Sequence, residues 1–278
     1  MRAMPVSEVE NLEIRFLLEG LKHIYGYDFR EYADASLRRR LTHWLAEAGF
    51  ANFSLAQSRL LREPGLFHSL LQGITVNVTE MFRDPEFFKA VRTQVVPFLK
   101  TYPFVKIWHA GCASGEEAYS MAILLNEEGM AGRYRLYATD IDEAVLERAA
   151  EGIIPLVDMR RSTRNYQQSG GHASFSDYYS ARHDSAILAT ELKRNIVFAP
   201  HNLAADAEFG EMHVVFCRNV MIYFKPVLKA RCLRLFDNSL GPGGFLCLGT
   251  KETLDLSGYA GRYEELARPL RIYRKRYA

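Results

Sequence analysis

The sequence is poor in the features that mark secreted, membrane-spanning and metal-binding proteins. Its 278 residues include only four cysteines, and none lies in a Cys-x-x-Cys pair, which disfavours a zinc or redox motif. No apolar run approaches the roughly 18 residues of a membrane span, and the N-terminus has no signal-peptide pattern. Cys217 and Cys247 lie in apolar runs and are expected to be buried thiols, so a reducing, cytoplasmic location fits best.

The sequence also has little net charge. Lys and Arg number 35 against 33 Asp and Glu, which gives a formal net charge of +2 at pH 7. A nearly neutral chain offers no bulk electrostatic argument for binding nucleic acid or a membrane surface. The hydrophobic fraction of 48% is sufficient for a substantial core, and the length allows one large domain or two of ordinary size.

A dinucleotide-binding fingerprint is missing, although a related pattern is present. An apolar run from Val105 to Ala110 is followed by the turn Gly111-Cys-Ala-Ser-Gly115, a helical pattern and a second apolar run that ends on Asp140. This order predicts a strand, a turn, a helix and a strand, which is half of a nucleotide-binding α/β sheet. Glycines let backbone N–H groups approach a ligand, and a carboxylate at a strand end can accept hydrogen bonds from ribose hydroxyls.

The two residues after this turn indicate which ligand it would take. Glu116 and Glu117 begin the predicted helix, where carboxylates suit the positive end of the helix dipole but would repel a pyrophosphate. They would tolerate or bind a ligand with a cationic amino group and a sulfonium, as S-adenosylmethionine has. The pattern therefore favours that cofactor, and the alternative is an ordinary loop in some other α/β protein.

Residues 1 to about 75 show helical periodicity without strand signals, which predicts a small helical bundle with its own core. Its apolar stripes are Leu12, Phe16, Leu17, Leu21 and Ile24; Leu37, Leu41, Trp44, Leu45 and Ala48; Leu60 and Leu61; and Leu66, Phe67, Leu70, Leu71 and Ile74. Gly49 is expected to stop the second helix and Ser54 to cap the third. Arg38, Arg39 and Arg40 are either a solvated helix face or a basic surface that docks an acidic partner.

A short polar stretch connects this bundle to the rest of the chain. Asp84 and Pro85 form an N-cap and first-turn pair, so a new helix is predicted to start there. Asn77, Thr79 and Arg83 precede it, between two apolar helices. A lone arginine is usually a surface charge, but seams of this kind often line a cleft.

The remaining strands are predicted from apolar runs in the second half of the chain. They cover 195–200, 212–217, 245–249 and 270–273, with a helix at about 225–240 and a glycine-rich turn at 241–244. Asn202 and Leu203 follow one strand, and Arg218 and Asn219 follow another. The carboxyl ends of parallel strands are where such sheets bind ligands. Residues 153–192 have poor periodicity, so their elements are not assigned.

Five motifs, in this order, resemble the CheR family of chemotaxis receptor methyltransferases along nearly the whole chain. They are Asn77-Val-Thr-Glu-Met-Phe-Arg83, Gly111-Cys-Ala-Ser-Gly-Glu-Glu117, Ala138-Thr-Asp-Ile-Asp142, His201-Asn-Leu203 and Phe216-Cys-Arg-Asn-Val-Met-Ile-Tyr-Phe224. The resemblance implies an all-α domain at 1–75, a linker and connecting helix at 76–100, and a Rossmann-like class I methyltransferase domain at 101–278. That domain would be α/β with a mostly parallel sheet and a small inserted β-subdomain at 153–193.

The resemblance also implies an activity. Members of this family transfer a methyl group from S-adenosylmethionine to glutamate side chains of chemoreceptor signalling helices, which gives glutamate methyl esters and S-adenosylhomocysteine. The chain is accordingly expected to be a cytoplasmic protein-glutamate O-methyltransferase of sensory adaptation. It would need no metal, bind no nucleic acid and not be embedded in a membrane.

The family's functional positions carry over individually. The cofactor-binding residues that the resemblance implies are Asn77, Thr79, Arg83, Gly111, Glu117, Asp140, Asn202, Leu203, Arg218 and Asn219. Arg83 and Tyr223 would be catalytic: the planar fork of Arg83 matches the substrate carboxylate, and Tyr223 would lie beside the methyl donor. Arg38, Arg39 and Arg40 would dock acidic receptor helices. Met81 and residues 249–252 depart from the family's usual residues, which leaves the role of that loop open.

Three further expectations concern alternatives and partners. A dinucleotide-dependent dehydrogenase is disfavoured by the missing third glycine and the paired glutamates. A catalytically silent sensor or scaffold is disfavoured by the intact polar set from Arg83 through Tyr223. Some family members tether to a receptor's C-terminal pentapeptide through a glycine-containing loop of the β-subdomain. The corresponding stretch, 179–188, is short and lacks glycine, so this chain is predicted to bind no such tether.

Overall fold

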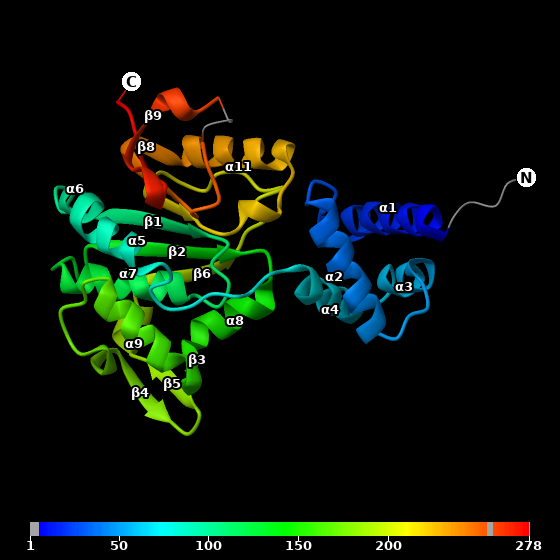
Figure 1. Ribbon diagram of the computed structural model, residues 1–278, viewed down its shortest axis with the longest axis horizontal. Coiled ribbons are helices and arrows are strands. Elements are labelled where there is room, and N and C mark those ends of the chain that lie inside the picture. Colours follow the sequence, from blue (N-terminus) through cyan, green and yellow to red (C-terminus); the bar gives the residue numbers. More distant parts are fainter. Residues whose placement is uncertain (1–5, 255–257, 278) are drawn as a thin grey trace, which may run out of the picture. The chain divides into compact units, whose positions relative to one another are not determined.

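A computed structural model of the chain describes residues 6–254 and 258–277 (Figure 1). The chain divides into two compact units. The first comprises the residues up to Val76 together with 202–206 and 223–232, and the second comprises 77–201, 207–222 and the residues from 233 onward. No helix within the described ranges has the length and apolarity to cross a membrane.

The first unit is built on four helices, as the apolar stripes predict. They are α1 (Val6–Tyr25), α2 (Asp34–Glu47), α3 (Phe53–Leu60) and α4 (Pro64–Ile74). Leu21, Leu41 and Leu70 are fully buried, and the indole N–H of Trp44 donates to Ser69 Oγ at 3.1 Å. Gly49 takes a left-handed φ of 73° directly after α2, which confirms that the helix stops there.

Two details of this bundle differ from the prediction. Asn52, not Ser54, caps α3: its side-chain oxygen accepts the N–H of Leu55, while the Ser54 hydroxyl donates to Glu13. Phe16 and Ile24 are 51% and 57% exposed, so they do not belong to the core. The buried side chains of α1 are Leu17, Leu18 and Leu21, so its buried stripe is narrower than the sequence pattern.

The second unit contains a seven-stranded sheet with the order β6-β2-β1-β7-β8-β10-β9. Its strands are β1 (Val105–Ala110), β2 (Tyr134–Asp140), β6 (Ile196–Pro200), β7 (Met212–Cys217), β8 (Leu240–Leu248), β9 (Tyr263–Ala267) and β10 (Ile272–Lys275). The first five in spatial order are parallel, and β10 is antiparallel to both neighbours. This confirms the mostly parallel α/β sheet.

The chain order reverses between β1 and β7. From β1 the chain moves outward to β2 and β6, and it then returns to place β7 on the other side of β1. Open α/β sheets bind ligands at such a switch point, outside the carboxyl ends of the strands. The residues that follow β1 and β7, namely Gly111 onward and Arg218 onward, are therefore the ones the topology brings together.

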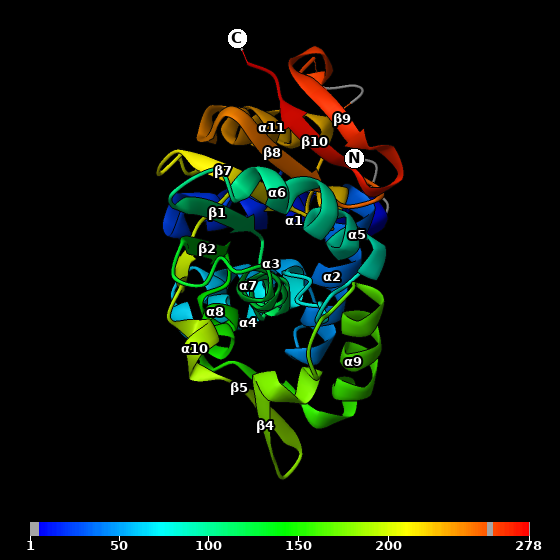
Figure 2. The same cartoon turned by 90° about the vertical axis from the view of Figure 1, so that its left-hand side faces the viewer.

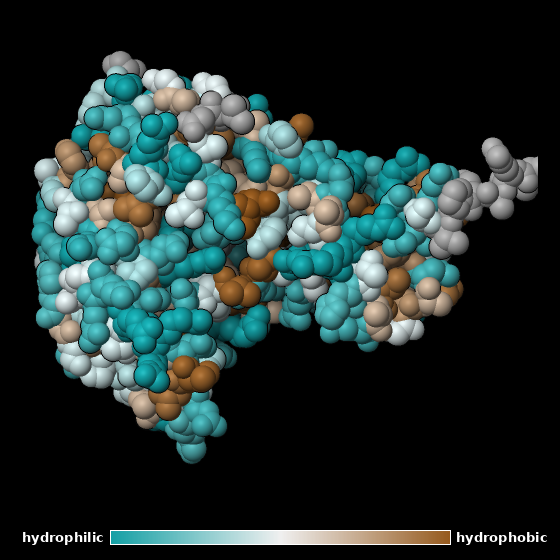
Figure 3. All heavy atoms as spheres, in the orientation of Figure 1, coloured by the Kyte–Doolittle hydropathy of each residue, from teal (hydrophilic) through white to brown (hydrophobic). Residues whose placement is uncertain are grey.

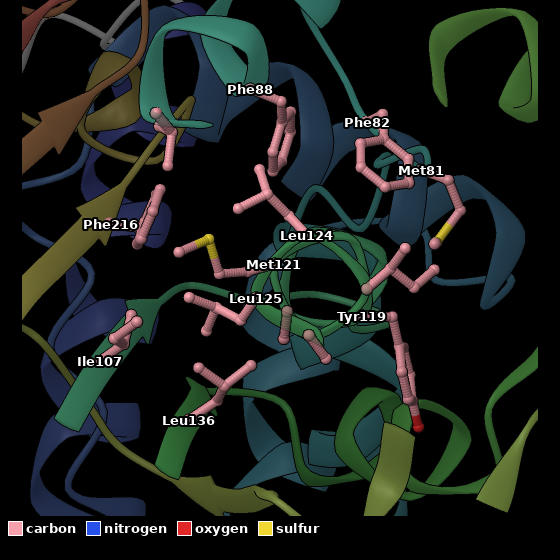
Figure 4. Close-up of a cluster of buried hydrophobic side chains, with 14 of the residues drawn as sticks. Met81, Phe82, Phe88, Ile107, Tyr119, Met121, Leu124, Leu125, Leu136 and Phe216 are labelled. Carbon is pink, nitrogen blue, oxygen red and sulfur yellow. The ribbon is translucent and has the colours of Figure 1, made fainter. Parts of the chain in front are cut away.

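Helices cover both faces of this sheet. On one face lie α5 (Pro85–Ala90), a π-helical turn (Val91–Val95), α6 (Val96–Leu99) and α7 (Glu116–Glu127). Figure 4 shows α7 surrounded by apolar side chains from the sheet and from the segment before α5, including Ile107, Phe216 and Met81. On the other face, Phe236 of α11 (Pro226–Ser239) packs edge-on against Trp108 at 5.4 Å between ring centroids.

Residues 153–192, whose helices and strands the sequence pattern does not assign, lie in the inserted subdomain. After α8 (Glu143–Glu151) come β3 (Ile153–Pro155), α9 (Met159–Gln168), β4 (Tyr179–Arg182), β5 (Ser185–Leu188) and α10 (Thr190–Lys193). The strands pair in the antiparallel order β3-β5-β4, and the β4–β5 hairpin lies at the periphery (Figure 2). Strands of three or four residues are too short to show a period, and α9 buries two polar residues, Ser162 and Asn165, beside Met159 and Tyr166.

Two predicted elements near the C-terminus are wrong, and one strand there was not predicted. The glycines at 241–244 do not form a turn but lie inside β8, where the pairing shifts register opposite Met212 and Val214. Such an irregularity inserts extra residues into a strand, which glycine tolerates. The last strand is 272–275, because Arg268–Leu270 form a 3₁₀ turn. The sequence pattern also missed β9, whose Glu264 and Glu265 are charged.

Candidate functional site

The turn after β1 is fixed to the end of β2. The N–H groups of Gly111 and Cys112 both donate to the carbonyl of Thr139, at 2.8 and 2.9 Å. Gly111 has a φ of 76°, and a Cβ there would lie 2.5 Å from Val220 Cγ2. Glycine is therefore required at 111 both for its conformation and for the close approach of the segment after β7.

Asp140 is oriented by backbone donors. One of its carboxylate oxygens accepts the N–H of Ala113 at 2.9 Å, and the other accepts the N–H of Asp142 at 3.2 Å. Burial raises the pKa of Asp140, and these backbone hydrogen bonds oppose that rise. Both oxygens keep further lone pairs, so the side chain can accept hydrogen bonds from a ligand at the end of β2.

Glu117 lies at the centre of a buried polar cluster. One carboxylate oxygen is 3.0 Å from His109 Nδ1, and the other accepts from Arg218 Nη1 at 3.0 Å. The side chains of His109 and Arg218 are 0% and 1% exposed, whereas that of Glu117 is 17% exposed. Burial would raise the pKa of Glu117, but the hydrogen bond from His109 and the charge of Arg218 outweigh it and lower the pKa. Glu117 is thus a fixed carboxylate with part of its surface open.

Arg218 connects this cluster to the segment before α5. Its Nη2 donates to the carboxylate of Asp84 at 2.7 Å, and its guanidinium carbon lies 3.9 Å from the ring centroid of Phe87. Asp84 is the N-cap residue of α5 and Pro85 opens the helix, as predicted, but Asp84 has a left-handed φ of 58° and its side chain makes no cap hydrogen bond. Among Glu117, Asp84 and Arg218, one guanidinium faces two carboxylates, which leaves a surplus of negative charge that suits a cationic ligand.

The loop at 249–252, whose role the sequence does not define, holds Asn219 in place. The buried carboxylate of Glu252 accepts three backbone N–H groups, from Gly249 at 2.6 Å and from Asn219 and Val220 at 3.0 Å each. Asn219 has a φ of 62°, and its Oδ1 is buried without a hydrogen-bond partner among the described residues. Glu252 therefore fixes a strained turn whose amide oxygen is available to a ligand.

The segment from Asn77 to Arg83 is fixed at both ends. Asn77 Nδ2 donates to Asp142 at 3.2 Å, and Met81 and Phe82 are fully buried. Arg83 is partly exposed, and its Nη1 donates at 3.3 Å to the carbonyl of Val78 within the same segment. Thr79 is likewise partly exposed. The two ends of the segment are thus held by a hydrogen bond and by packing, while the guanidinium of Arg83 is partly exposed and can contact a ligand from solvent.

Three other predicted site residues belong to the first unit. The side-chain oxygen of Asn202 accepts the N–H of Ala204 at 2.9 Å, and Leu203 is 8% exposed. The carbonyl of Tyr223 accepts the N–H of Ala33 at 2.8 Å, and the guanidinium of Arg40 lies 5.4 Å from its ring centroid. The other predicted cofactor-binding residues belong to the second unit, namely Asn77, Thr79, Arg83, Gly111, Glu117, Asp140, Arg218 and Asn219.

Comparison with known proteins decides the family. A model described as the SAM-binding domain of CheR methyltransferases matches residues 77–266, and the all-alpha domain of the same methyltransferases matches residues 12–75. The chain belongs to the CheR methyltransferase family. A Pseudomonas putida protein with the name "Putative methyltransferase Cher3" is 49% identical over 95% of this chain and 97% of its own length.

Relatives with chemotaxis in their names are more distant. A chemotaxis protein methyltransferase from Vibrio anguillarum is 30% identical over 95% of both chains. Another from Listeria monocytogenes is 27% identical over 84% of this chain and 87% of its own length. The cofactor of this CheR family member is S-adenosylmethionine.

The residues present fit this cofactor. Its amino group and sulfonium are cationic, and the cluster of Glu117, Arg218 and Asp84 has surplus negative charge. Asp140 offers carboxylate oxygens for ribose hydroxyls, and the unpartnered Oδ1 of Asn219 offers one more acceptor. No group of three or more His, Cys, Asp or Glu side chains in the described ranges is arranged to hold a metal ion.

Replacing Asp140 by alanine is expected to weaken S-adenosylmethionine binding by roughly 1–3 kcal/mol, the scale for a buried hydrogen bond left unmade. Titration calorimetry measures this directly. The exposed Asp177 supplies a matched control, Asp177→Ala, which should bind like the wild type. Unchanged affinity of the Asp140 variant would remove this residue from the cofactor site.

Proposed function

We propose that this protein transfers a methyl group from S-adenosylmethionine to glutamate side chains on the cytoplasmic helices of chemoreceptors, giving glutamate methyl esters. The chemotaxis names of several relatives support this substrate class. The observation that carries it is that Arg83 lies next to the cluster of Glu117, Arg218 and Asp84. Arg83 is a reachable guanidinium, and the next residue, Asp84, is bonded through Arg218 to Glu117. A cytoplasmic location is part of the proposal.

The proposed reaction asks little of the protein beyond positioning. When bound, S-adenosylmethionine supplies a methyl group that its sulfonium centre activates. The acceptor glutamate is ionised at neutral pH, so no general base has to be provided. Arg83 would hold the acceptor carboxylate through its planar fork and offset its repulsion from Glu117 and Asp84. The buried cluster would orient Glu117 and keep water from it. Tyr223 is proposed as the second catalytic residue.

Incubation with labelled S-adenosylmethionine and candidate receptor cytoplasmic fragments tests this function. We expect label on glutamate residues, located by peptide mapping and removed by mild base as a methyl ester. Label on another residue type would overturn the glutamate assignment. Cofactor binding without transfer to any fragment would favour a silent sensor or scaffold.

The three arginines proposed for docking are not equivalent in the structure. Consecutive helical residues point roughly 100° apart. Arg38 is paired with Glu10 at 2.8 Å and with Asn11, and Arg40 donates to the carbonyl of Thr75 at 3.1 Å. Arg39 is exposed and has no ion pair or hydrogen bond among the described residues. Of the three arginines, Arg39 is therefore the one that we propose contacts the receptor. Arg40 is better placed to position the Tyr223 ring.

Replacing Arg39 by glutamate is expected to raise the apparent KM for receptor fragments severalfold and to flatten its salt dependence, because exposed charge pairs are screened by salt. Arg40→Leu should instead lower kcat. The exposed Arg62 of the first unit supplies the control Arg62→Glu, which should behave like the wild type. An unaltered KM for the Arg39 variant would show that this residue is a solvated charge only.

The absence of a pentapeptide tether stays a prediction. Residues 179–188 form a hairpin in which only His183 and Asp184 separate β4 from β5, and β4 is an edge strand of its sheet. Titration calorimetry with C-terminal pentapeptides of receptors from the same cell should give no binding. Micromolar affinity that is lost on mutation of 179–188 would show that the β4 edge accepts a peptide strand.

A further inference from the structure

Three neighbouring apolar side chains of the inserted subdomain, which we call the apolar step, are exposed to solvent. Ile153, Leu156 and Val157 are 48%, 36% and 85% exposed, and they lie within five residues on β3 and the 3₁₀ turn that follows it. Figure 3 shows a hydrophobic patch on this part of the second unit. Single exposed aliphatic residues need no explanation, but a group of three beside one another is a feature of interaction surfaces.

Unpaired positive charge borders this step. The helix α9 starts directly after the turn and exposes Arg160 and Arg164, which lie one helical turn apart on the same side. Neither has an ion pair or hydrogen bond within the described part of the chain. Their neighbour Arg161, by contrast, is paired with Glu80 at 2.6 Å and Asp158 at 3.1 Å. Two arginines are thus free for a partner, and the third has a structural role.

The same helix is fixed to the segment that carries Arg83. Besides the pair between Arg161 and Glu80, the side-chain amide of Asn165 donates to the carbonyl of Met81 at 3.1 Å. Both contacts are made to residues between Asn77 and Arg83. The segment on which the proposed function places the acceptor carboxylate therefore contacts the same helix that carries Arg160 and Arg164, on a side roughly 100° around its axis.

We propose that the β3–α9 face, defined as Ile153, Leu156, Val157, Arg160 and Arg164, docks the helix that carries the acceptor glutamate. This rests on the proposed function. A helix with several glutamates beside an apolar stripe is complementary to it: its aliphatic side chains would contact the step, and its carboxylates would meet the two arginines. A second copy of this chain is a poorer partner, because a two-fold interface would set these arginines against each other.

Two double variants test the face by its two kinds of contact. Leu156→Ser with Val157→Ser removes the apolar step, and Arg160→Glu with Arg164→Glu reverses the charge. Each is expected to raise the apparent KM and the Kd for helical receptor fragments about tenfold, the effect of 1.4 kcal/mol. The kcat at saturating fragment and the affinity for S-adenosylmethionine should not change, since no cofactor-site residue is altered. A thermal melt confirms that each variant is folded.

Matched substitutions elsewhere provide the control. Val227 is 69% exposed and Arg276 is exposed, and both lie outside the β3–α9 face. Val227→Ser and Arg276→Glu should keep the wild-type KM and Kd. Wild-type values in the two double variants would overturn the inference, as would a fall in kcat without a change in KM. A concentration-dependent dimer that the double variants abolish would also overturn it, in favour of self-association.

The binding measurement separates this inference from the proposed function. If the wild-type protein binds acidic helical fragments but transfers no methyl group, the proposed reaction fails, and the Kd values of the variants still decide the docking face. If the wild-type protein binds none of these fragments, the docking face is overturned.

Discussion

Replacing Arg218 by methionine is expected to lower the free energy of unfolding by about 3–5 kcal/mol, the scale for removing one partner of a buried ion pair. The guanidinium is 1% exposed and is bonded to Glu117 and Asp84, so its loss leaves two carboxylates facing each other without a cation. Its stacking on Phe87 is lost as well. Binding of S-adenosylmethionine should become undetectable, because Glu117 loses one of the two groups that fix it. Denaturant unfolding and titration calorimetry measure the two effects.

Arg92 supplies an unusually close control. Its side chain is 7% exposed and is paired with Glu127 at 2.6 Å and Glu128 at 2.9 Å, so it too is a buried arginine between two carboxylates. Arg92→Met should destabilise the protein by a similar amount but leave the cofactor affinity of the folded fraction intact. A loss of binding in both variants would mean that general destabilisation, not the cluster around Glu117, explains the result.

The partners of Arg218 offer a second check. In the background of Arg218→Met, the further substitution Asp84→Asn removes one of the uncompensated charges and should restore part of the lost stability. Such non-additivity is the signature of residues that share one network. Destabilisation below about 1 kcal/mol for Arg218→Met alone would show that water or another group compensates the carboxylates.

The parts of the site that the sequence predicts are those defined by local geometry. A glycine that tolerates a left-handed φ, followed by a helix and a strand that ends on a carboxylate, is a pattern contained within 36 residues, from Val105 to Asp140. The structure has this arrangement, with Ala113 donating to Asp140 across the turn. The parallel sheet follows from the same repeated order of apolar runs and helical stripes.

Some residues that the sequence analysis did not identify make hydrogen bonds to residues far away in the sequence. Glu252 lies 33 residues from the backbone N–H of Asn219 that it accepts, and nothing near it in the sequence indicates that its carboxylate is buried. His109 is a different case. A polar residue inside the apolar run 105–110 was a signal that could have been read, because buried polar groups need partners. Its partner, Glu117, follows eight residues later on α7.

The resemblance implied an inserted β-subdomain, but its individual helices and strands were not predictable from the residue pattern. Ile154 and Ala186 are buried in strands of three and four residues, and α9 faces the core with as many polar as apolar residues. Burial of Asn165 is compensated by its hydrogen bond to Met81, a contact that only the folded chain reveals. Asp84 is a related case: its place at the N-cap of α5 was predicted, but the use of its side chain was not, because its bond to Arg218 spans 134 positions.

The second large effect is expected at Arg83. Arg83→Ala should reduce kcat on receptor fragments by about 10²-fold, the effect of misplacing a reacting group, while the affinity for S-adenosylmethionine changes little. The side chain is partly exposed, and its one hydrogen bond among the described residues is to the carbonyl of Val78, so its removal should not destabilise the fold. Single-turnover kinetics at saturating cofactor isolates the chemical step.

Two further variants sharpen the assignment of Arg83. Arg83→Lys keeps the positive charge but not the planar fork, so it should recover only part of the lost rate if the acceptor carboxylate is held through two hydrogen bonds. Tyr223→Phe removes a hydroxyl and keeps the ring, which tests the second catalytic residue separately. If Arg83→Ala bound the cofactor much more weakly yet retained a normal single-turnover rate once the cofactor was saturating, Arg83 would be a cofactor ligand and the acceptor carboxylate would have to be held by another group. A full recovery in Arg83→Lys would instead mean that charge alone, without the geometry of the guanidinium, offsets the repulsion between the acceptor and the carboxylates of Glu117 and Asp84.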